Sequence, residues 1–212
     1  MQTIQKEEKV TRMIKIVLPL LLAALVFTAC NTNQKFEING QVSDKNLDGE
    51  WVYLVPMVNA PVERVDSTQL KNGSFTFKGK VAEPEIYIIR MRPFLRLSHQ
   101  ELLVVKEPGT LQVYLGANSK VAGTALNDSL QTWKVQKEII DNKMLFLQQN
   151  LKNADVANQD KISNELEKLR SERANYSFRF VKNNRNNVVG EMVSRIMKGA
   201  FTPEQRKELG IE

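Results

Sequence analysis

The chain has 212 residues, a formal net charge of +6 and a single cysteine, Cys30. Residues 30–212 carry 26 Lys and Arg against 22 Asp and Glu, and no basic block stands out. This mild, dispersed surplus argues against nucleic acid as a partner, because nucleic acid binding needs a clustered basic patch. One cysteine also excludes an internal disulfide and a CxxC redox centre within this sequence.

The first predicted element is an export signal that ends at Cys30. Basic residues up to position 15 precede an apolar run over 16–27, which is too short for a bilayer core that needs roughly 20 residues. The following Thr-Ala-Cys resembles the lipobox of bacterial lipoproteins, although Phe27 stands where leucine is usual. We therefore expect residues 1–29 to be a signal peptide and Cys30 to be lipidated, with palmitate among its acyl chains. The alternative is a plain secretory signal, and translation starts at either Met1 or Met13.

Residues 30–35 then form the lipidated residue and a short polar tether, so the expected partner is the membrane. No acidic run follows Cys30 to suggest display on the cell surface. The expected location is the cell envelope, by default the periplasmic face of the outer membrane.

The pattern over 36–125 predicts an antiparallel β domain. Short apolar or alternating runs are separated by turn residues, as in a sandwich or open barrel. Asn72-Gly73 predicts a hairpin, since both residues tolerate positive φ, and Pro108-Gly109 predicts another turn. The predicted strands cover 36–42, 51–56, 64–70, 74–80, 85–91, 101–106 and 110–115.

The pattern over 127–212 predicts helices. Apolar residues recur every three or four positions in two series, which favours an α-helical hairpin that starts at an Asn127 or Asp128 cap. A third helix is expected over 187–198, and Thr202-Pro203 with Gln205 predicts a capping box that opens a last short helix. The expected fold class is thus α+β: an antiparallel β-sandwich-like domain, then a helical hairpin and one or two short helices.

Several of these segments together resemble a known domain. DSTQLKNGSFTFKG at 66–79 is similar to part of the N-terminal domain of unknown function that precedes thioredoxin-like, thiol:disulfide interchange modules in envelope lipoproteins of Gram-negative bacteria. Further similar segments follow one another in chain order. They are FEINGQV (36–42), VAEPEIYII (81–89), VVKEPGTLQVYL (104–115), VAGTALNDSLQTW (121–133) and FVKNNRNNVVGEMV (180–193).

The resemblance covers residues 36 to about 208 and implies no catalytic residue here, because the redox chemistry of those proteins belongs to the thioredoxin-like module. Since the sequence ends at Glu212, where that module would begin, we expect either a stand-alone relative or a fragment of a longer product.

The candidate functional residues are few. Asp66 with Ser67 suggests a carboxylate in a binding site, or a strand-end side chain that bonds nearby amides. Arg90, Arg92 and Arg96 suggest contact with an anionic ligand or lipid headgroups, or simply a solvated strand face. His99 is the only histidine, so a multi-histidine metal site is excluded. The aromatic seam with Trp133, Tyr176, Phe178 and Phe180 fits a core better than a docking surface.

These observations predict a non-catalytic interaction or scaffold module on a lipid anchor, with no metal and no cofactor. Its expected partner is a periplasmic thioredoxin-like protein or another envelope protein. One alternative is the N-terminal portion or partner subunit of a thiol:disulfide oxidoreductase. Another is a lipoprotein that binds a small anionic ligand near Arg90 and Arg92.

Overall fold

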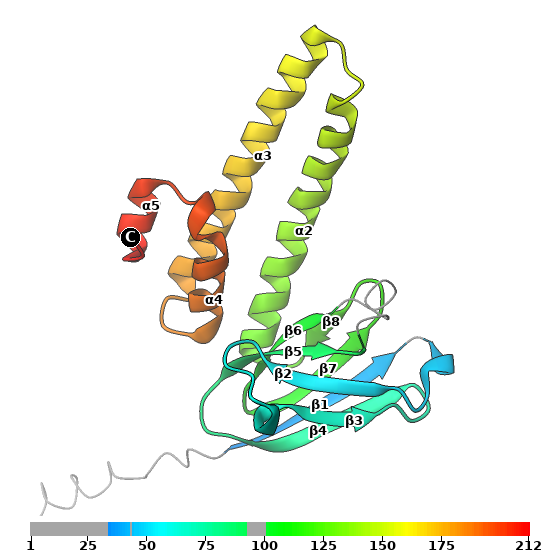
Figure 1. Ribbon diagram of the computed structural model, residues 1–212. Coiled ribbons are helices and arrows are strands. Elements are labelled where there is room, and N and C mark those ends of the chain that lie inside the picture. Colours follow the sequence, from blue (N-terminus) through cyan, green and yellow to red (C-terminus); the bar gives the residue numbers. More distant parts are fainter. Residues whose placement is uncertain (1–33, 43, 93–100) are drawn as a thin grey trace, which may run out of the picture. The chain divides into compact units, whose positions relative to one another are not determined.

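The structure is a computed structural model that describes residues 34–42, 44–92 and 101–212. Within these ranges eight strands are followed by four α-helices, which confirms the α+β fold class (Figure 1). The strands are β1 (Gln34–Val42), β2 (Trp51–Pro56), β3 (Asp66–Gln69), β4 (Ser74–Val81), β5 (Glu85–Arg90), β6 (Leu102–Lys106), β7 (Gly109–Leu115) and β8 (Lys120–Ala122). The helices are α2 (Ala125–Leu151), α3 (Val156–Asn183), α4 (Val188–Met197) and α5 (Pro203–Leu209).

The strands form two four-stranded sheets, in the orders β4-β1-β7-β8 and β3-β2-β5-β6. All neighbours are antiparallel except β1 and β7, which pair in parallel with Ile38 opposite Leu111. The predicted antiparallel β domain is therefore confirmed except at this pair, and the three-residue β8 was not predicted.

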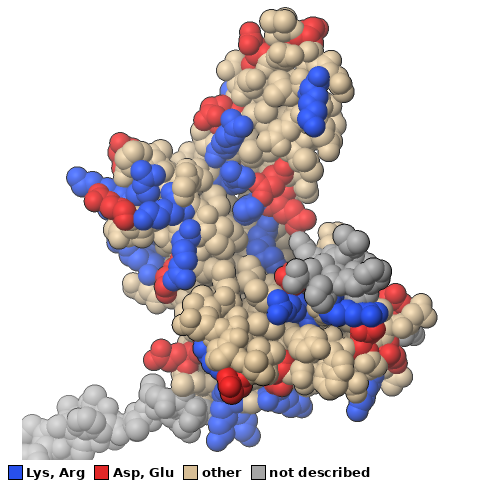
Figure 2. Space-filling view, viewed as in Figure 1, with Lys and Arg blue, Asp and Glu red and all other residues tan. Residues whose placement is uncertain are grey.

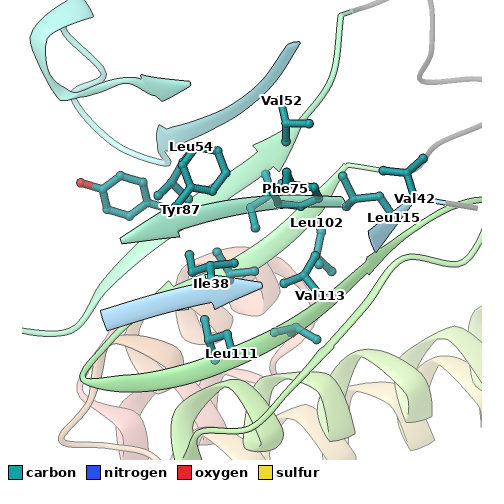
Figure 3. Close-up of a cluster of buried hydrophobic side chains, with 14 of the residues drawn as sticks. Ile38, Val42, Val52, Leu54, Phe75, Tyr87, Leu102, Leu111, Val113 and Leu115 are labelled. Atoms are coloured by element: carbon teal, nitrogen blue, oxygen red, sulfur yellow. The ribbon is translucent and has the colours of Figure 1, made fainter. Parts of the chain in front are cut away.

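The core of the β domain lies between the two sheets. Ile38, Leu54 and Ile89 are at most 1% exposed, and Figure 3 shows side chains from both sheets meeting in this layer. Because successive side chains of a strand point to opposite faces, the alternating apolar residues of β1 and β4 all enter this core.

Both predicted turns are present, but each joins strands of different sheets. Asn72 and Gly73 have φ of 54° and 70°, and Lys71 and Ser74 on either side of them exchange two backbone hydrogen bonds in an antiparallel bridge. Beyond this bridge the chain separates, since β3 and β4 lie in different sheets. The Pro108-Gly109 turn likewise carries the chain from β6 in one sheet to β7 in the other. The hairpin prediction at Asn72-Gly73 is thus confirmed for the turn itself and wrong for the pairing of β3 with β4, because a turn fixes a reversal of direction and not the pairing partner. At Pro108-Gly109 the predicted turn is present.

The helices pack against the β5 and β6 side of the outer face of the β3-β2-β5-β6 sheet. Val105 from β6 is fully buried in a second apolar cluster with residues of α2, α3 and α4. Side chains that point to this face of the sheet complete the cluster, namely Met57, Ile86 and Leu103. The opposite sheet keeps a polar outer face.

The helices α2 and α3 pack along each other as the predicted hairpin. Trp133 and Phe180 lie with ring centroids 6.0 Å apart, and the Trp133 indole donates to Ser177 Oγ at 3.1 Å. Farther from the sheets the hairpin has its own small cluster of buried residues: Ile140, Met144, Leu166 and Leu169. The aromatic seam is thus core, as predicted.

Of the two predicted caps, the one at Thr202 is confirmed and the one at Asn127 or Asp128 is wrong. Asn187 caps α4 by accepting from Val189 N and Gly190 N, and Thr202 forms a capping box with Gln205 in α5. The prediction at α2 is wrong, because α2 starts at Ala125 and places Asn127 and Asp128 in its first turn.

Candidate functional site

The sequence-predicted site residues do not form one site. Asp66 pairs with Leu54, which in turn pairs with Ile89, and both of these face the core. Arg90 lies on the next rung with Tyr53, and neighbouring rungs face opposite sides of a sheet. Asp66 and Arg90 are therefore directed to opposite faces. Cys30, Arg96 and His99 lie outside the described residues.

Two of the three remaining candidates, Asp66 and Arg92, make local structural contacts. The Asp66 carboxylate accepts from the backbone amide of Ser67 at 2.8 Å, which is the local bond expected of a strand-end aspartate. Arg92 is 2.8 Å from the carboxylate of Glu50, so its charge is already paired. Arg90 ends β5 and is half-buried. An anion site built on Asp66, Arg90 and Arg92 is not supported by this arrangement.

A buried carboxylate joins the sheets to the helices. Glu107 is 7% exposed, and its Oε1 accepts from the backbone amides of Leu126 and Asn127, both at 3.1 Å, and from the Thr124 hydroxyl. A carboxylate at a helix N-terminus satisfies free amides and opposes the positive end of the helix dipole. Glu107 therefore anchors the start of α2 to the end of β6.

The Asn127 side chain completes this junction. It is fully buried, accepts from Val105 N at 2.9 Å and donates to Val105 O at 2.8 Å. Two of the segments that carry the family resemblance, 104–115 with Glu107 and 121–133 with Asn127, thus meet in one hydrogen-bond network. Sequence reasoning missed this pairing, although the two segments were singled out separately.

Aromatic and glycine residues of the segments that carry the family resemblance also pack against one another. A Cβ at Gly40 would lie 1.9 Å from the Phe75 ring, and a Cβ at Gly79 would lie 2.8 Å from the Phe36 ring. Each glycine leaves space for a ring on the neighbouring strand, since β1 pairs with β4. These motif positions therefore serve packing and not chemistry.

A charged group lies between the two long helices. Asp141 accepts from Arg173 at 2.8 Å and also from Lys137. Burial would raise the pKa of Asp141, but the hydrogen bonds from Lys137 and Arg173 outweigh this and hold its pKa below the usual value. Arg173 and Lys137 also line an open hollow of about 770 Å³ beside α4.

The charged form of Lys134, which lies near this group on α2, is disfavoured by burial. Burial lowers the pKa of Lys134 to about 8, and the nearby Glu138 offsets only part of the effect. Lys134 lines a second hollow, of about 490 Å³, between α2 and the β7–β8 turn. Neither hollow contains a set of groups recognisable as a nucleophile with its base.

Helix α2 carries a second apolar stripe on the side away from α3. Val135, Ile139 and Phe146 follow one another at helical spacing and are 46%, 44% and 62% exposed. Large apolar side chains aligned on one exposed face are typical of contact surfaces. Sequence reasoning missed this stripe, because only the series that faces α3 was followed.

Among the described residues, no group of three or more His, Cys, Asp or Glu side chains is placed to hold a metal ion. Across the same residues, no helix combines the length and apolar character needed to cross a bilayer.

The fold and these contacts define a small α+β module with a β-sandwich and an attached helical hairpin. Residues 36–130 match a family described as Domain of unknown function (DUF4369), which confirms the resemblance to a domain of unknown function over that range. No curated protein and no solved structure matches the chain. The matched residues end within the first two turns of α2, so they include the Glu107–Asn127 network.

Proposed function

We propose that the protein is a lipid-anchored envelope protein whose residues 34–212 act as a non-catalytic interaction module facing the periplasm. The sequence before the β-sandwich supports the anchor, since an export signal ends at Cys30, four positions before β1. Stable anchoring follows from several acyl chains on one residue, whereas a single chain binds a membrane only marginally.

The observation that carries the interaction role is the exposed stripe of α2. One face of α2 packs against α3. Val135, Ile139 and Phe146 lie on the other face and contribute nothing to the core of the hairpin. An apolar stripe of this width is suited to an apolar surface of another protein. The proposed partner is a periplasmic thioredoxin-like protein or another envelope protein.

The anchor is tested by the intact mass of the protein extracted from bacterial membranes. A mass equal to residues 30–212 plus lipid is expected, and Cys30→Ala should release the protein into the soluble fraction. A mass larger by about one thioredoxin domain would instead favour the front half of a thiol:disulfide oxidoreductase. An unlipidated soluble protein would contradict the proposal.

The interaction role is tested by a photo-crosslinking residue at Ile139 or at Phe146. The same envelope protein should be captured from both positions in membranes, whereas a probe at the exposed Glu172 of α3 serves as the matched control. Equal capture at Glu172, or none at the two stripe positions, would contradict it.

A further inference from the structure

Two lysines face each other at the first rungs of the β1–β4 ladder. Lys35 and Lys80 are register partners, and both are exposed. Their neighbours Phe36 and Val81 point into the core, so the two lysines lie on the polar outer face of the β4-β1-β7-β8 sheet. Figure 2 shows basic side chains along the lower edge of the sandwich, on the side away from the helices.

The pair Lys35 and Lys80 is here termed the lysine rung. Its positive charge is not neutralised by the neighbouring pairs of the β1–β4 ladder. The next rung on the same face pairs Glu37 with Lys78, whose charged groups lie 3.0 Å apart and neutralise each other. The hydrogen bond from Lys78 accordingly holds the pKa of Glu37 below its usual value. Like charges directly opposite each other on a sheet are unfavourable, so the rung gains from a nearby anion.

The closeness of Lys35 to Cys30 in the sequence indicates which anions lie within reach of the pair. Only residues 31–33 separate Cys30 from Gln34, the first residue of β1. Four residues reach at most about 14 Å when fully extended. A lipid on Cys30 therefore keeps the start of β1, and with it the lysine rung, close to the headgroups that surround the anchor.

We propose that Lys35 and Lys80 dock the β-sandwich onto anionic lipid headgroups of the leaflet that holds the anchor. This inference rests on the lipidation of Cys30 proposed above. Each lysine close to an anionic surface favours contact by about fivefold, so the two together favour it by about thirtyfold. That would be weak for a free protein, but the tether supplies a high effective concentration of headgroups.

The docking sets which parts of the protein face away from the membrane. The helices pack against β5 and β6 of the other sheet, and α2 meets the docking sheet at β8, the edge opposite β4. Contact through Lys35 and Lys80 therefore leaves α2 and its exposed stripe accessible. The lysine rung then orients the surface that the proposed interaction requires.

The test uses the full lipidated chain in vesicles, either of phosphatidylcholine alone or with about one third phosphatidylglycerol. Exposed amines are acetylated, and each lysine is quantified by mass spectrometry. Lys35 and Lys80 should be protected severalfold only in the anionic vesicles, and 0.5 M salt, at roughly a 4 Å screening length, should remove the protection. Lys152 and Lys161 at the far end of the hairpin are the internal reference, since both are exposed.

A second readout uses variants. The reporter is a fluorophore on Thr110→Cys, which sits on the same outer face opposite Glu37, and the vesicles carry a headgroup quencher. Lys35→Gln with Lys80→Gln should reduce quenching in anionic vesicles, whereas Lys152→Gln with Lys161→Gln, which removes the same charge, should not.

The outcomes separate the two proposals. A protein whose mass lacks lipid overturns both the anchor and the docking. A lipidated, vesicle-bound protein with equal labelling of all four lysines in both vesicle types overturns the docking alone. Quenching that falls equally in both double variants reflects net charge only, and it also overturns the lysine rung as the contact.

Discussion

The β-sandwich and the outer half of the helical hairpin bury their apolar side chains to very different extents. The sandwich core lies between two sheets and includes side chains such as Ile38 and Leu102 that have no exposed surface. The outer half of the hairpin relies on one seam between two helices, with Ile140, Met144, Leu166 and Leu169 as its buried residues. We therefore expect the outer half of the hairpin to open before the sandwich.

The largest expected effect comes from a truncation in the sandwich. Ile38→Ala removes a fully buried side chain from β1, which is flanked by β4 and β7, and should cost about 4 kcal/mol of unfolding free energy. Urea denaturation measures it. Thr110→Ala on the outer face of the same sheet is the control and should change stability by less than about 0.5 kcal/mol. A loss below about 1 kcal/mol for Ile38→Ala would mean that this core is loosely packed.

The next effect tests the junction between the two regions. Glu107→Gln removes the charge that faces the first turn of α2 and should cost about 2 to 3 kcal/mol. Hydrogen exchange should accelerate most at the amides of Leu126 and Asn127. Glu63→Gln, at an exposed glutamate, is the matched control. Unchanged exchange at both amides would show that Glu107 does not hold the helix.

A truncation in the outer hairpin should cost less and act locally. Leu166→Ala should cost about 2 kcal/mol, because a two-helix seam can partly collapse onto the space that is left. Amide exchange should become faster in the outer turns of α2 and α3 and stay unchanged in β1. Equal acceleration in the sandwich would contradict the expectation that the outer half of the hairpin opens first.

The smallest effect is a gain. Lys134 has a folded-state pKa of about 8, below the 10.5 of an ordinary lysine, so protonation opposes folding. The penalty is fully present below pH 8 and fades as pH rises to 10.5, because over that range the unfolded chain binds more protons. Lys134→Met should therefore raise stability at pH 7 by about 1 kcal/mol, after allowance for partial exposure, and by less at pH 10. Thermal melts at both pH values measure this, and a constant difference would contradict it.

Local pattern was sufficient for the helices and insufficient for the sheets. The Thr202 capping box was recognised because a cap depends on its own few neighbours. The partners of β1 were not recognised, since β4 and β7 are distant in sequence and nothing in Asn72-Gly73 or Pro108-Gly109 tells which sheet receives the next strand. The positions of the strands were predictable, but their order was not.

The candidate site failed for a related reason. Asp66 and Arg90 come from strands on either side of β2, and a shift of one rung decides which face each side chain takes. That register is fixed by the packing of Leu54 and Ile89 in the core, which no local motif encodes. The Glu107–Asn127 network shows the reverse case, in which two motifs noticed separately form one structural unit.

The Asn127 side-chain amide affects whether strands of other molecules can pair with the edge of the β3-β2-β5-β6 sheet. β6 is the outermost strand in the order β3-β2-β5-β6, and the outermost strand of a sheet invites pairing with strands of other molecules. The side chain of Asn127 occupies both backbone groups of Val105, as a neighbouring strand would. The backbone groups of Val105, in the middle of this edge, are therefore not free to pair with a strand of another molecule. This contact therefore disfavours edge-to-edge association between copies of the protein.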